Sequence, residues 1–243
     1  MNAHSSAGAR PIRLLVHGAN GRMGQAVQRL AAGRGDVEIV AAVARTVGQR
    51  VVDGIPQYAA SELGGAPAFD VAIDFSLPGG FDAVLALCVE RGAALVSGTT
   101  GLDAARKSAI AEAGRAIPVA WASNFSLGVA VLADLVARAA RTLPQWECDI
   151  VELHHKRKLD APSGTALTLG GIAASQGAEP RYASIRAGDI VGEHIVQFTG
   201  EGERIELVHR ASNRDIFARG ALHAATRLVG RPAGVYGIAD LID

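Results

Sequence analysis

A strand-like run that leads directly into a glycine-rich loop and a helical pattern constrains this chain more than any other feature. The run "IRLLVH" precedes "GANGRMG", where Gly18, Gly21 and Gly24 recur at every third residue before the helical stretch "MGQAVQRLAAGRG". Glycines at such a turn let the backbone approach a pyrophosphate, and the helix N-terminus adds N–H groups and a positive dipole. Glycines also make ordinary turns, and G-x-x-G-x-x-G departs from the commoner G-x-G-x-x-G. In this context the loop predicts dinucleotide binding, with Arg22 beside the phosphates.

Short β-rich runs and alanine-rich helical stretches continue to alternate up to about residue 125. The runs "VEIVAAVA", "FDVAIDF", "AALVSG" and "IPVAWAS", with a turn-rich gap after the first of them, predict a doubly wound Rossmann-type parallel sheet. After a long helix over 126–142 the pattern changes to β-rich segments, which predict a second, α+β domain. The last helix, "RDIFARGALHAATRLVG", is alanine-rich like the first domain's helices. We therefore expect an α/β protein with one domain over 1–125 plus 214–243 and another over 126–213.

Composition excludes several partner classes. The 243-residue chain is 49% hydrophobic and carries 24 Lys plus Arg against 24 Asp plus Glu, so we expect no nucleic-acid or membrane partner. The N-terminal residues lack the apolar stretch of a signal peptide, and Asp134 and Arg138 interrupt the most apolar helix pattern. Cys88 and Cys148 both lie in apolar stretches and form no disulfide framework. These features predict a soluble, cytoplasmic protein.

The end of the second strand indicates which dinucleotide is preferred. An Asp or Glu at that position usually accepts from the adenosine ribose, but here the strand ends with Ala44 and Arg45. Glu38 lies at the nominal distance from Gly18, yet it opens the strand and so lies at the wrong edge for a ligand. An arginine without an acidic neighbour suits a 2′-phosphate, so NADPH is favoured over NADH. The alternative is that Arg45 is a surface residue without a ligand.

Three further strand ends fall at the same edge of the predicted sheet. They are Asp74–Ser76, Gly98–Gly101 and Ser123–Ser126. Asp74, Ser76 or Asp103 could each simply cap the helix that follows, and Phe125 could pack on a nicotinamide ring or between domains. Together these ends predict a nucleotide cleft. The candidate cofactor-binding residues are Gly18, Asn20, Gly21, Arg22, Met23, Gly24, Arg45, Phe75, Gly98, Thr99, Thr100, Ser123, Asn124 and Phe125.

The stretch "HHKRKLDAPSGT", from His154 to Thr165, concentrates positive charge in a chain of zero formal net charge. His154 and His155 point to opposite faces of a strand, and no Cys-x-x-Cys or His-x-x-x-His is nearby, so we expect no metal site. Downstream, Ser163 reads as the N-cap of a helix whose first amides, at Gly164 and Thr165, attract anions. A charge run is often only a solvated surface. Basic side chains beside a helix N-terminus instead favour a site for carboxylates or phosphates.

Motifs along nearly the whole chain resemble one enzyme family. "GANGRMG", "DFSLP", "GTTG", "NFSLGV", "ELHHKRKLDAPSGTAL", "RAGDIVGEH" and "ASNRDIFARGAL" are similar, in this order, to dihydrodipicolinate reductase, the 4-hydroxy-tetrahydrodipicolinate reductase of lysine and diaminopimelate synthesis. The resemblance implies an N-terminal dinucleotide domain completed by the C-terminal segment. It also implies a central domain that binds a small cyclic dicarboxylate and forms a homotetramer, with hinge closure between the two domains.

The resemblance also implies residue roles. His154 would act near the proton-transfer step, Lys158 would assist it and contact a substrate carboxylate, and His155, Ser163, Gly164 and Thr165 would surround the carboxylates. Many relatives carry an acidic residue where this chain has Ala44, which leaves NADH as the lesser cofactor. The segment "TVGQRVVDGIPQYAAS" is also shorter than usual.

Two other functions remain open on the residues alone. A different nicotinamide oxidoreductase, acting on a semialdehyde or a sugar acid, would use a similar scaffold, although a phosphorylating semialdehyde dehydrogenase needs an activated cysteine. A redox sensor or scaffold that binds NADP would not need Lys158 beside the amides that follow Ser163.

Overall fold

The computed structural model describes residues 10–242, which divide into two compact units after Phe125. The N-terminal unit comprises the described residues up to Phe125 and those from Phe217 onward, and the central unit comprises Ser126–Ile216. The final helix of the chain therefore belongs almost entirely with the N-terminal unit.

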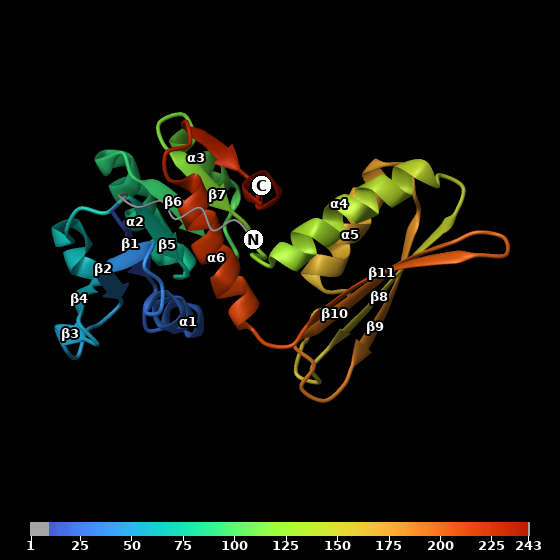
Figure 1. Cartoon of the computed structure of the whole chain (residues 1–243), viewed down its shortest axis with the longest axis horizontal. Helices are drawn as coiled ribbons and strands as arrows, with labels where there is room; N and C mark the ends of the chain where they lie inside the picture. Colours follow the sequence, from blue (N-terminus) through green and yellow to red (C-terminus); the bar gives the residue numbers. More distant parts are fainter. Residues whose placement is uncertain (1–9, 243) are drawn as a thin grey trace, which may run out of the picture. The chain divides into compact units, whose positions relative to one another are not determined.

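The N-terminal unit is built on an eight-stranded sheet in the order β12-β7-β6-β5-β1-β2-β4-β3 (Figure 1). All of its strand pairs are parallel except β3 with β4. The strands are β1 (Ile12–His17), β2 (Val37–Ala44), β3 (Val51–Val52), β4 (Ile55–Ala59), β5 (Val71–Asp74), β6 (Ala94–Ser97), β7 (Pro118–Trp121) and β12 (Gly234–Tyr236). The helices are α1 (Arg22–Ala31), α2 (Pro78–Arg91), α3 (Ala104–Ala113) and α6 (Asp215–Leu228), with 3₁₀ turns η1 (Ala60–Gly65) and η2 (Ala239–Leu241).

The central strands of this sheet are short apolar runs with both faces covered. Every residue of β5 and β6 is buried, as expected for parallel strands between two helical layers. β1 pairs with β2 on one side and with β5 on the other, so the order of the strands reverses at β1. Ligands of doubly wound sheets bind at such a reversal, outside the carboxyl ends of the strands. The glycine loop that follows β1 lies at this position.

Three strands were not expected from the sequence. The turn-rich gap after β2 holds β3, β4 and η1, and the C-terminal β12 extends the sheet beside β7. The turn between β3 and β4 is Asp53-Gly54, with φ of 51° and 79°. An Asp-Gly pair with both φ positive is a strong hairpin signal, so these two strands could have been predicted.

The central unit is a four-stranded sheet with two helices on one face (Figure 1). The strand order is β11-β10-β8-β9, with β8 (Glu147–His154), β9 (Pro180–Arg186), β10 (Gly192–Thr199) and β11 (Arg204–Ala211). β8 is antiparallel to β10 and parallel to β9. Helices α4 (Leu127–Thr142) and α5 (Gly164–Ser175) pack on the sheet through a core that includes Val136, Ile150, Leu169 and Phe198.

Both helices of the central unit begin at a serine cap. The side chain of Ser126 accepts from the amide of Val129, and that of Ser163 accepts from the amide of Ala166. The N-cap predicted at Ser163 is therefore confirmed. Among the residues that the structure describes, no helix is long and apolar enough to cross a membrane.

Candidate active site

The glycine loop brings backbone segments closer together than side chains would allow. Gly18 has a φ of +78°, and a Cβ on it would lie 2.5 Å from the carbonyl oxygen of Phe75. A Cβ on Gly24 would overlap the carbonyl oxygen of Gly18. Both glycines are required for α1 to start directly above the end of β1, which leaves the first amides of α1 available to an anion.

Beside this loop lies a pocket of about 620 Å³. Five of the predicted cofactor-binding residues line it, together with residues from the end of β2 and the start of α2. Its lining is His17, Gly18, Asn20, Gly21, Ala44, Arg45, Ala60, Phe75, Ser76, Leu77, Gly79 and Gly80. The lining of the pocket thus extends from the glycine loop to Arg45, the predicted partner of a 2′-phosphate.

The other predicted cofactor-binding residues do not line this pocket. Arg22 is exposed at the first position of α1, Met23 follows it, and Thr100, Ser123 and Asn124 lie in the segments after β6 and β7. A Cβ on Gly98 would overlap the ring of Phe75. Phe125 is only 2% exposed and packs edge-on against Phe75, with ring centroids 5.9 Å apart.

A buried carboxylate ties together the strand ends beneath the pocket. Asp74, at the end of β5, is 0% exposed and pairs in register with His17 of β1 and Ser97 of β6. Its Oδ1 lies 2.9 Å from His17 Nδ1, and its Oδ2 accepts from Ser97 Oγ and Thr99 Oγ1, both at 2.7 Å. Its Oδ1 also accepts from the amide of Ser76 at 3.1 Å.

This arrangement excludes the alternative that Asp74 or Ser76 caps the helix that follows. The N-cap of α2 is Leu77, and no side chain caps that helix. Burial raises the pKa of Asp74, but the hydrogen bond and charge of His17, with hydrogen bonds from Ser76 and Ser97, outweigh burial and leave the pKa lowered. Asp103, in contrast, does cap α3 by accepting from the amide of Arg106.

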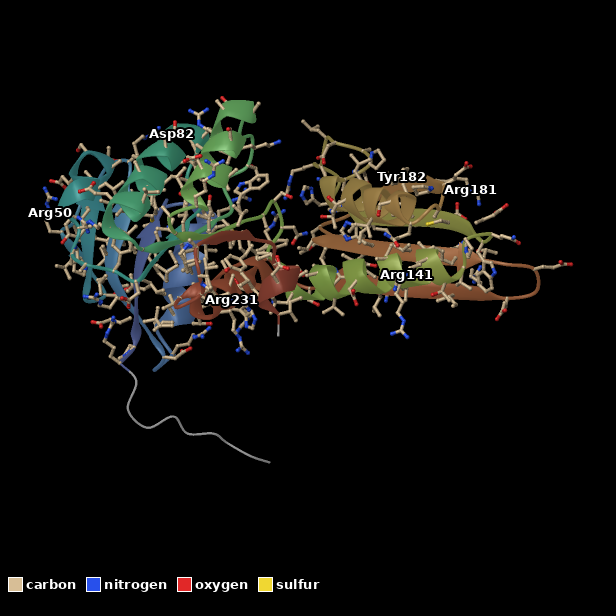
Figure 2. All side chains as sticks on the ribbon, turned by 90° about the horizontal axis from the view of Figure 1, so that it is seen from above. Arg50, Asp82, Arg141, Arg181, Tyr182 and Arg231 are labelled. Carbon is tan, nitrogen blue, oxygen red and sulfur yellow. The ribbon has the colours of Figure 1, made fainter. Side chains whose placement is uncertain are left out.

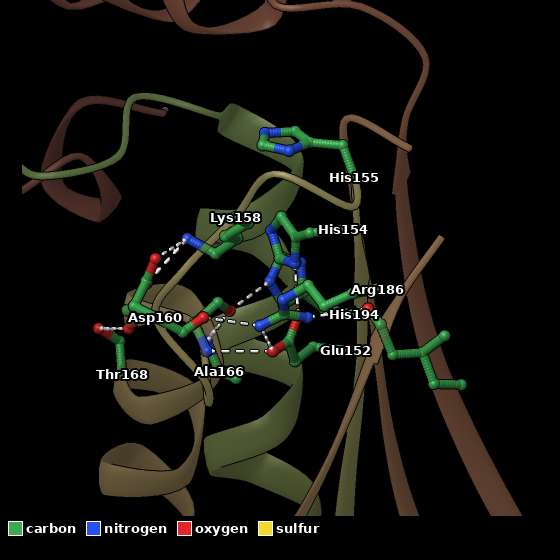
Figure 3. A network of polar contacts seen from close by, with 12 residues as sticks. Glu152, His154, His155, Lys158, Asp160, Ala166, Thr168, Arg186 and His194 are labelled. Atoms are coloured by element: carbon green, nitrogen blue, oxygen red, sulfur yellow. Dashed lines mark hydrogen bonds and ion pairs between the residues drawn. The ribbon is translucent and has the colours of Figure 1, made fainter. Parts of the chain in front are cut away.

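In the central unit, a second buried carboxylate lies where β8 ends. The register places Glu152 opposite His194 of β10 and Ser184 of β9, and it places His154 opposite Arg186. Glu152 Oε1 accepts from Arg186 Nη2 at 2.6 Å and from the amide of Ser163 at 3.2 Å, and Oε2 accepts from Arg186 Nη1 at 2.9 Å. Oε2 also contacts His154 Nδ1 (Figure 3).

Lys158 lies in the loop between β8 and α5. Its Nζ donates to both carboxylate oxygens of Asp160 at 2.8 Å, so the predicted catalytic lysine has an acidic partner within its own loop (Figure 3). Arg186 Nη2 also donates to the carbonyl oxygen of Asp160 at 2.7 Å. The basic stretch is therefore partly neutralised, and its loop is fastened to the Glu152 cluster.

His155 follows the end of β8 and lies apart from the Glu152 cluster (Figure 3). Its Nε2 is 3.3 Å from Arg214 Nη2. Gly164 and Thr165 form the start of α5, at the positive end of the helix dipole. The structure thus brings His154, Lys158, Ser163 and the start of α5 into one polar cluster, with His155 at its margin.

Two histidines that the sequence analysis did not single out extend this cluster. His194 Nε2 lies 3.2 Å from Ser163 Oγ, and the His194 ring is 5.3 Å from that of His154. His209 of β11 lies 6.5 Å beyond His194, with its Nε2 3.3 Å from Ser126 Oγ. Each serine that caps a helix therefore also contacts a histidine from the sheet.

Burial and neighbouring charges shift the pKa values of this cluster. Burial opposes ionisation of Glu152, but hydrogen bonds from Arg186, Ser184 and His154 outweigh it and lower its pKa to about 2. Burial lowers the pKa of His154, although the hydrogen bond and charge of Glu152 oppose this. Burial, with the charges of His154 and His209, lowers the pKa of His194 to about 4. At neutral pH the cluster therefore holds an ionised carboxylate and neutral imidazoles.

Glu152, Arg186 and His194 all lie within motifs that were quoted above without a role for these residues. A strand with Glu and His two residues apart places both on one face, so the sequence of β8 does carry a signal for the Glu152–His154 contact. The arginine and His194 come from strands much later in the chain. Only the pairing of β8 with β9 and β10 brings them to Glu152.

Comparisons with known proteins cover nearly the whole chain. The family model described as "Dihydrodipicolinate reductase, N-terminus" matches residues 12–125, and "Dihydrodipicolinate reductase, C-terminus" matches residues 128–242. A 4-hydroxy-tetrahydrodipicolinate reductase of Stenotrophomonas maltophilia (strain R551-3) is 69% identical over 234 residues, 96% of this chain and 98% of that protein. One of Xanthomonas campestris pv. campestris (strain B100) is 66% identical over 233 residues, with the same two shares.

Solved structures share the fold. A dipicolinate-bound dihydrodipicolinate reductase from Paenisporosarcina sp. TG-14 matches with a TM-score of 0.83 at 21% identity, covering 96% of this chain and 100% of that one. An amine dehydrogenase from Mycobacterium smegmatis matches with a TM-score of 0.61 at 14% identity, covering 96% of each chain. At these identities the likeness concerns the architecture alone, a doubly wound, mostly parallel sheet followed by a second α+β unit.

Proposed function

The chain belongs to the dihydrodipicolinate reductase family, and from this we propose how its two units share one reaction. The reaction is the reduction of 4-hydroxy-tetrahydrodipicolinate with NAD(P)H, in diaminopimelate and lysine biosynthesis. We assign the dinucleotide to the N-terminal unit, and substrate binding and oligomer formation to the central unit. The observation that carries this assignment is the cluster of His154, Lys158 and the α5 N-terminus, which suits a dicarboxylate.

The residues of the glycine loop fit a dinucleotide. Gly18 and Gly24 leave a backbone cradle that a Cβ would fill, at the point where the strand order of the sheet reverses. Asn20, Gly21 and the first amides of α1 would hold the pyrophosphate, and the bound cofactor would supply the hydride. Phe75 lines the pocket, and Phe125 supports its ring from behind.

NADPH is the proposed preferred cofactor. Arg45 is exposed and lines the pocket, whereas the neighbouring Ala44 offers no acceptor for ribose hydroxyls. A charged hydrogen bond to a 2′-phosphate is worth about 1.5 to 3 kcal/mol, or roughly ten- to a hundredfold in preference. An Arg45→Ala variant should lose most of that preference in kcat/KM, and an unchanged NADPH-to-NADH ratio would contradict the assignment.

In the central unit, the substrate's two carboxylates would meet cations and helix amides. We propose that His155, Ser163, Gly164 and Thr165 surround them, and that Lys158 exchanges its contact with Asp160 for one with a carboxylate. Hydride delivery leaves an enamine-like intermediate that must gain a proton. His154 and Lys158 are the groups proposed to hold and move that proton, directly or through water.

The two cysteine thiols argue against the alternative of a phosphorylating semialdehyde dehydrogenase. Cys88 and Cys148 are free and buried, and burial raises the pKa of Cys88 and raises that of Cys148 to about 11. A phosphorylating semialdehyde dehydrogenase needs a reactive thiolate, which neither residue supplies. Free thiols also suit a reducing compartment, and we propose a cytoplasmic location.

The uncovered face of the central sheet is the proposed oligomer interface. A row of apolar residues crosses all four strands on the face opposite α4 and α5: Val208, Ile195, Val151 and Ala183 are paired neighbours. Charged rows flank it, including Arg181 with Asp149 and Arg210 with Glu193. A second copy of the same face would bury the apolar row, and family resemblance suggests a homotetramer. Sedimentation should show an oligomer that Ile195→Arg dissociates; a wild-type monomer at micromolar concentration would contradict the interface.

A coupled assay tests the function itself. The preceding synthase, supplied with pyruvate and aspartate semialdehyde, generates the unstable substrate in place, and NADPH absorbance is followed. NADPH should be consumed only when both the synthase and this protein are present. No consumption, with NADPH binding intact, would favour the redox sensor or scaffold.

A further inference from the structure

We propose that Glu152, held by Arg186, is a positioning residue that keeps the proton of His154 on Nδ1 and leaves Nε2 as the nitrogen that takes part in the reaction. The same carboxylate fastens the Lys158 loop and the start of α5 to His154. This inference rests on the proposed function, because it assigns a reacting atom to a residue that the proposal places at the proton transfer.

The contacts of Glu152 define the tautomer of His154. Glu152 is 0% exposed and ionised, and an ionised carboxylate can only accept hydrogen bonds. His154 Nδ1 faces Glu152 Oε2, so Nδ1 must carry the proton and donate it. In a neutral imidazole the other nitrogen, Nε2, then has a free lone pair.

Gly192 of β10 lies beside that second nitrogen and carries no side chain. A Cβ on Gly192 would lie only 3.0 Å from His154 Nε2. Any side chain at position 192 would press against the ring. Because Gly192 has no side chain, the Nε2 edge of the ring stays open on this side. A nitrogen that exchanges a proton with a substrate or a water needs such an open edge.

Glu152 also connects the elements that hold the other candidate site residues. Its Oε1 accepts from the amide of Ser163 at the start of α5, and its partner Arg186 donates to the carbonyl oxygen of Asp160 in the Lys158 loop. One buried carboxylate–guanidinium pair therefore sets the places of His154, Lys158 and the α5 amides together. A merely structural ion pair would not need to contact all three.

Four charged or titratable groups face His154: Glu152 from its own strand, Lys158 from the loop, Arg186 from β9 and His194 from β10. The two cations lower the pKa of His154, as burial does, and only Glu152 opposes them. Arg186 also balances the charge of Glu152 through two hydrogen bonds to its carboxylate. Glu152 can therefore orient His154 while its own negative charge is neutralised by Arg186.

The same two strands contain a matched control. Near the other end of β8 and β9, Arg181 donates to Asp149 Oδ1 at 2.7 Å and to Oδ2 at 2.9 Å (Figure 2). That pair is partly exposed, flanks the proposed oligomer interface and lies far along the strand from His154. Asp149→Asn removes a carboxylate from the same strand pair without touching the cluster, and sedimentation checks that its oligomeric state equals that of wild type.

The test combines kinetics with ¹⁵N NMR of the imidazole nitrogens in full-length Glu152→Gln, Asp149→Asn and wild-type protein, with His154 assigned from a His154→Asn spectrum. In Glu152→Gln, the side-chain carbonyl oxygen would accept from Arg186 and the Ser163 amide, so its NH₂ group would point toward His154 Nδ1. Nδ1 would then accept a hydrogen bond, and the imidazole proton would move to Nε2. We expect wild type and Asp149→Asn to show the Nδ1–H form. Glu152→Gln should show the Nε2–H form and a kcat at least about tenfold lower, with the Kd for NADPH unchanged.

An Nε2–H form of His154 in wild type would overturn the inference even if the variant failed to fold, because that measurement needs no variant at position 152. An unchanged tautomer and kcat in a folded Glu152→Gln protein would also overturn it. Failure of the coupled assay in wild type would instead count against the proposed function, while the tautomer would still be readable.

Discussion

The two units each place a buried carboxylate beside a histidine at the end of a strand, but they surround it differently. Asp74 of the N-terminal unit takes its hydrogen bonds from His17, two hydroxyls and one amide. Glu152 of the central unit takes its hydrogen bonds from His154, the Ser184 side chain, one amide and the guanidinium of Arg186. A histidine, two hydroxyls and an amide fix the geometry around Asp74, whereas the bidentate guanidinium of Arg186 balances Glu152.

Under the proposed function, this difference separates a scaffold from a reaction site. The Asp74 network joins the ends of β1, β5 and β6 beneath a pocket, so it shapes the loops proposed to bind the cofactor. The Glu152 network contacts residues proposed to hold the proton and the substrate. Because Arg186 cancels the charge of Glu152, the pair adds no net negative charge that would repel an anionic dicarboxylate. Substitutions in the first network should therefore alter cofactor affinity, and those in the second should alter turnover or substrate binding.

The largest expected effect is that of Lys158→Ala. If Lys158 stabilises charge that develops during the reaction, kcat should fall by about 10² or more, with NADPH affinity unchanged, because the glycine loop belongs to the other unit. Lys156→Ala is the matched control, since Lys156 is an exposed lysine of the same loop. Steady-state kinetics and fluorescence titration with NADPH measure the two quantities. A Lys158→Ala enzyme within about threefold of wild-type kcat would end the catalytic assignment.

His194 should make the central unit sensitive to acid. Its folded-state pKa of about 4 lies below the ordinary 6.5, so the unfolded chain takes up the proton first as the pH falls. Stability is therefore lost between pH 6.5 and 4, by about 3 kcal/mol at about 1.4 kcal/mol per pKa unit. His194→Gln should lose less over this range.

Tryptophan fluorescence can follow this effect in the central unit alone. Trp121 lies in the N-terminal unit and Trp146 in the central unit, so a Trp121→Phe background leaves Trp146 as the reporter. Urea unfolding of both proteins at pH 7 and pH 5 gives the two differences in free energy. Equal acid sensitivity with and without His194 would assign the loss to other groups.

The smallest expected effect is that of His155→Ala. His155 lies outside the Glu152 cluster and contacts Arg214 rather than the groups proposed to move the proton. Its loss should raise the KM for substrate about three- to tenfold with little change in kcat. A fall in kcat comparable to that of Lys158→Ala would show that His155 acts in catalysis, and would contradict its assignment to substrate binding alone.

Much of the architecture could be predicted from local patterns. The alternation of apolar runs and helices gave the parallel sheet, and "APSGT" correctly gave the Ser163 cap, because both depend on residues close together in the chain. The Asp53-Gly54 hairpin was missed although its signal was present. Capping by Asp74 stayed open as an alternative on the sequence, because the partners of Asp74, Ser97 and Thr99, become its neighbours only when the strands pair.

The candidate site was predictable only in part for the same reason. His154, Lys158 and Ser163 lie in one continuous motif, so the sequence places them near each other. Arg186 and His194 join them through the registers of β9 and β10 against β8, which no local pattern specifies. Burial decides their importance, since only the structure shows that Glu152 is fully enclosed and that Arg186 balances it.

The division of labour between the two networks is tested most directly by measuring Asp74→Asn and Glu152→Gln side by side. Each variant removes one buried charge and keeps its shape, and each is assayed for the Kd of NADPH and for kcat at saturating cofactor. We predict that Asp74→Asn raises the Kd about tenfold and leaves kcat within about threefold, whereas Glu152→Gln lowers kcat at least about tenfold and leaves the Kd within about threefold. Two variants that change the same parameter to the same extent would contradict the account.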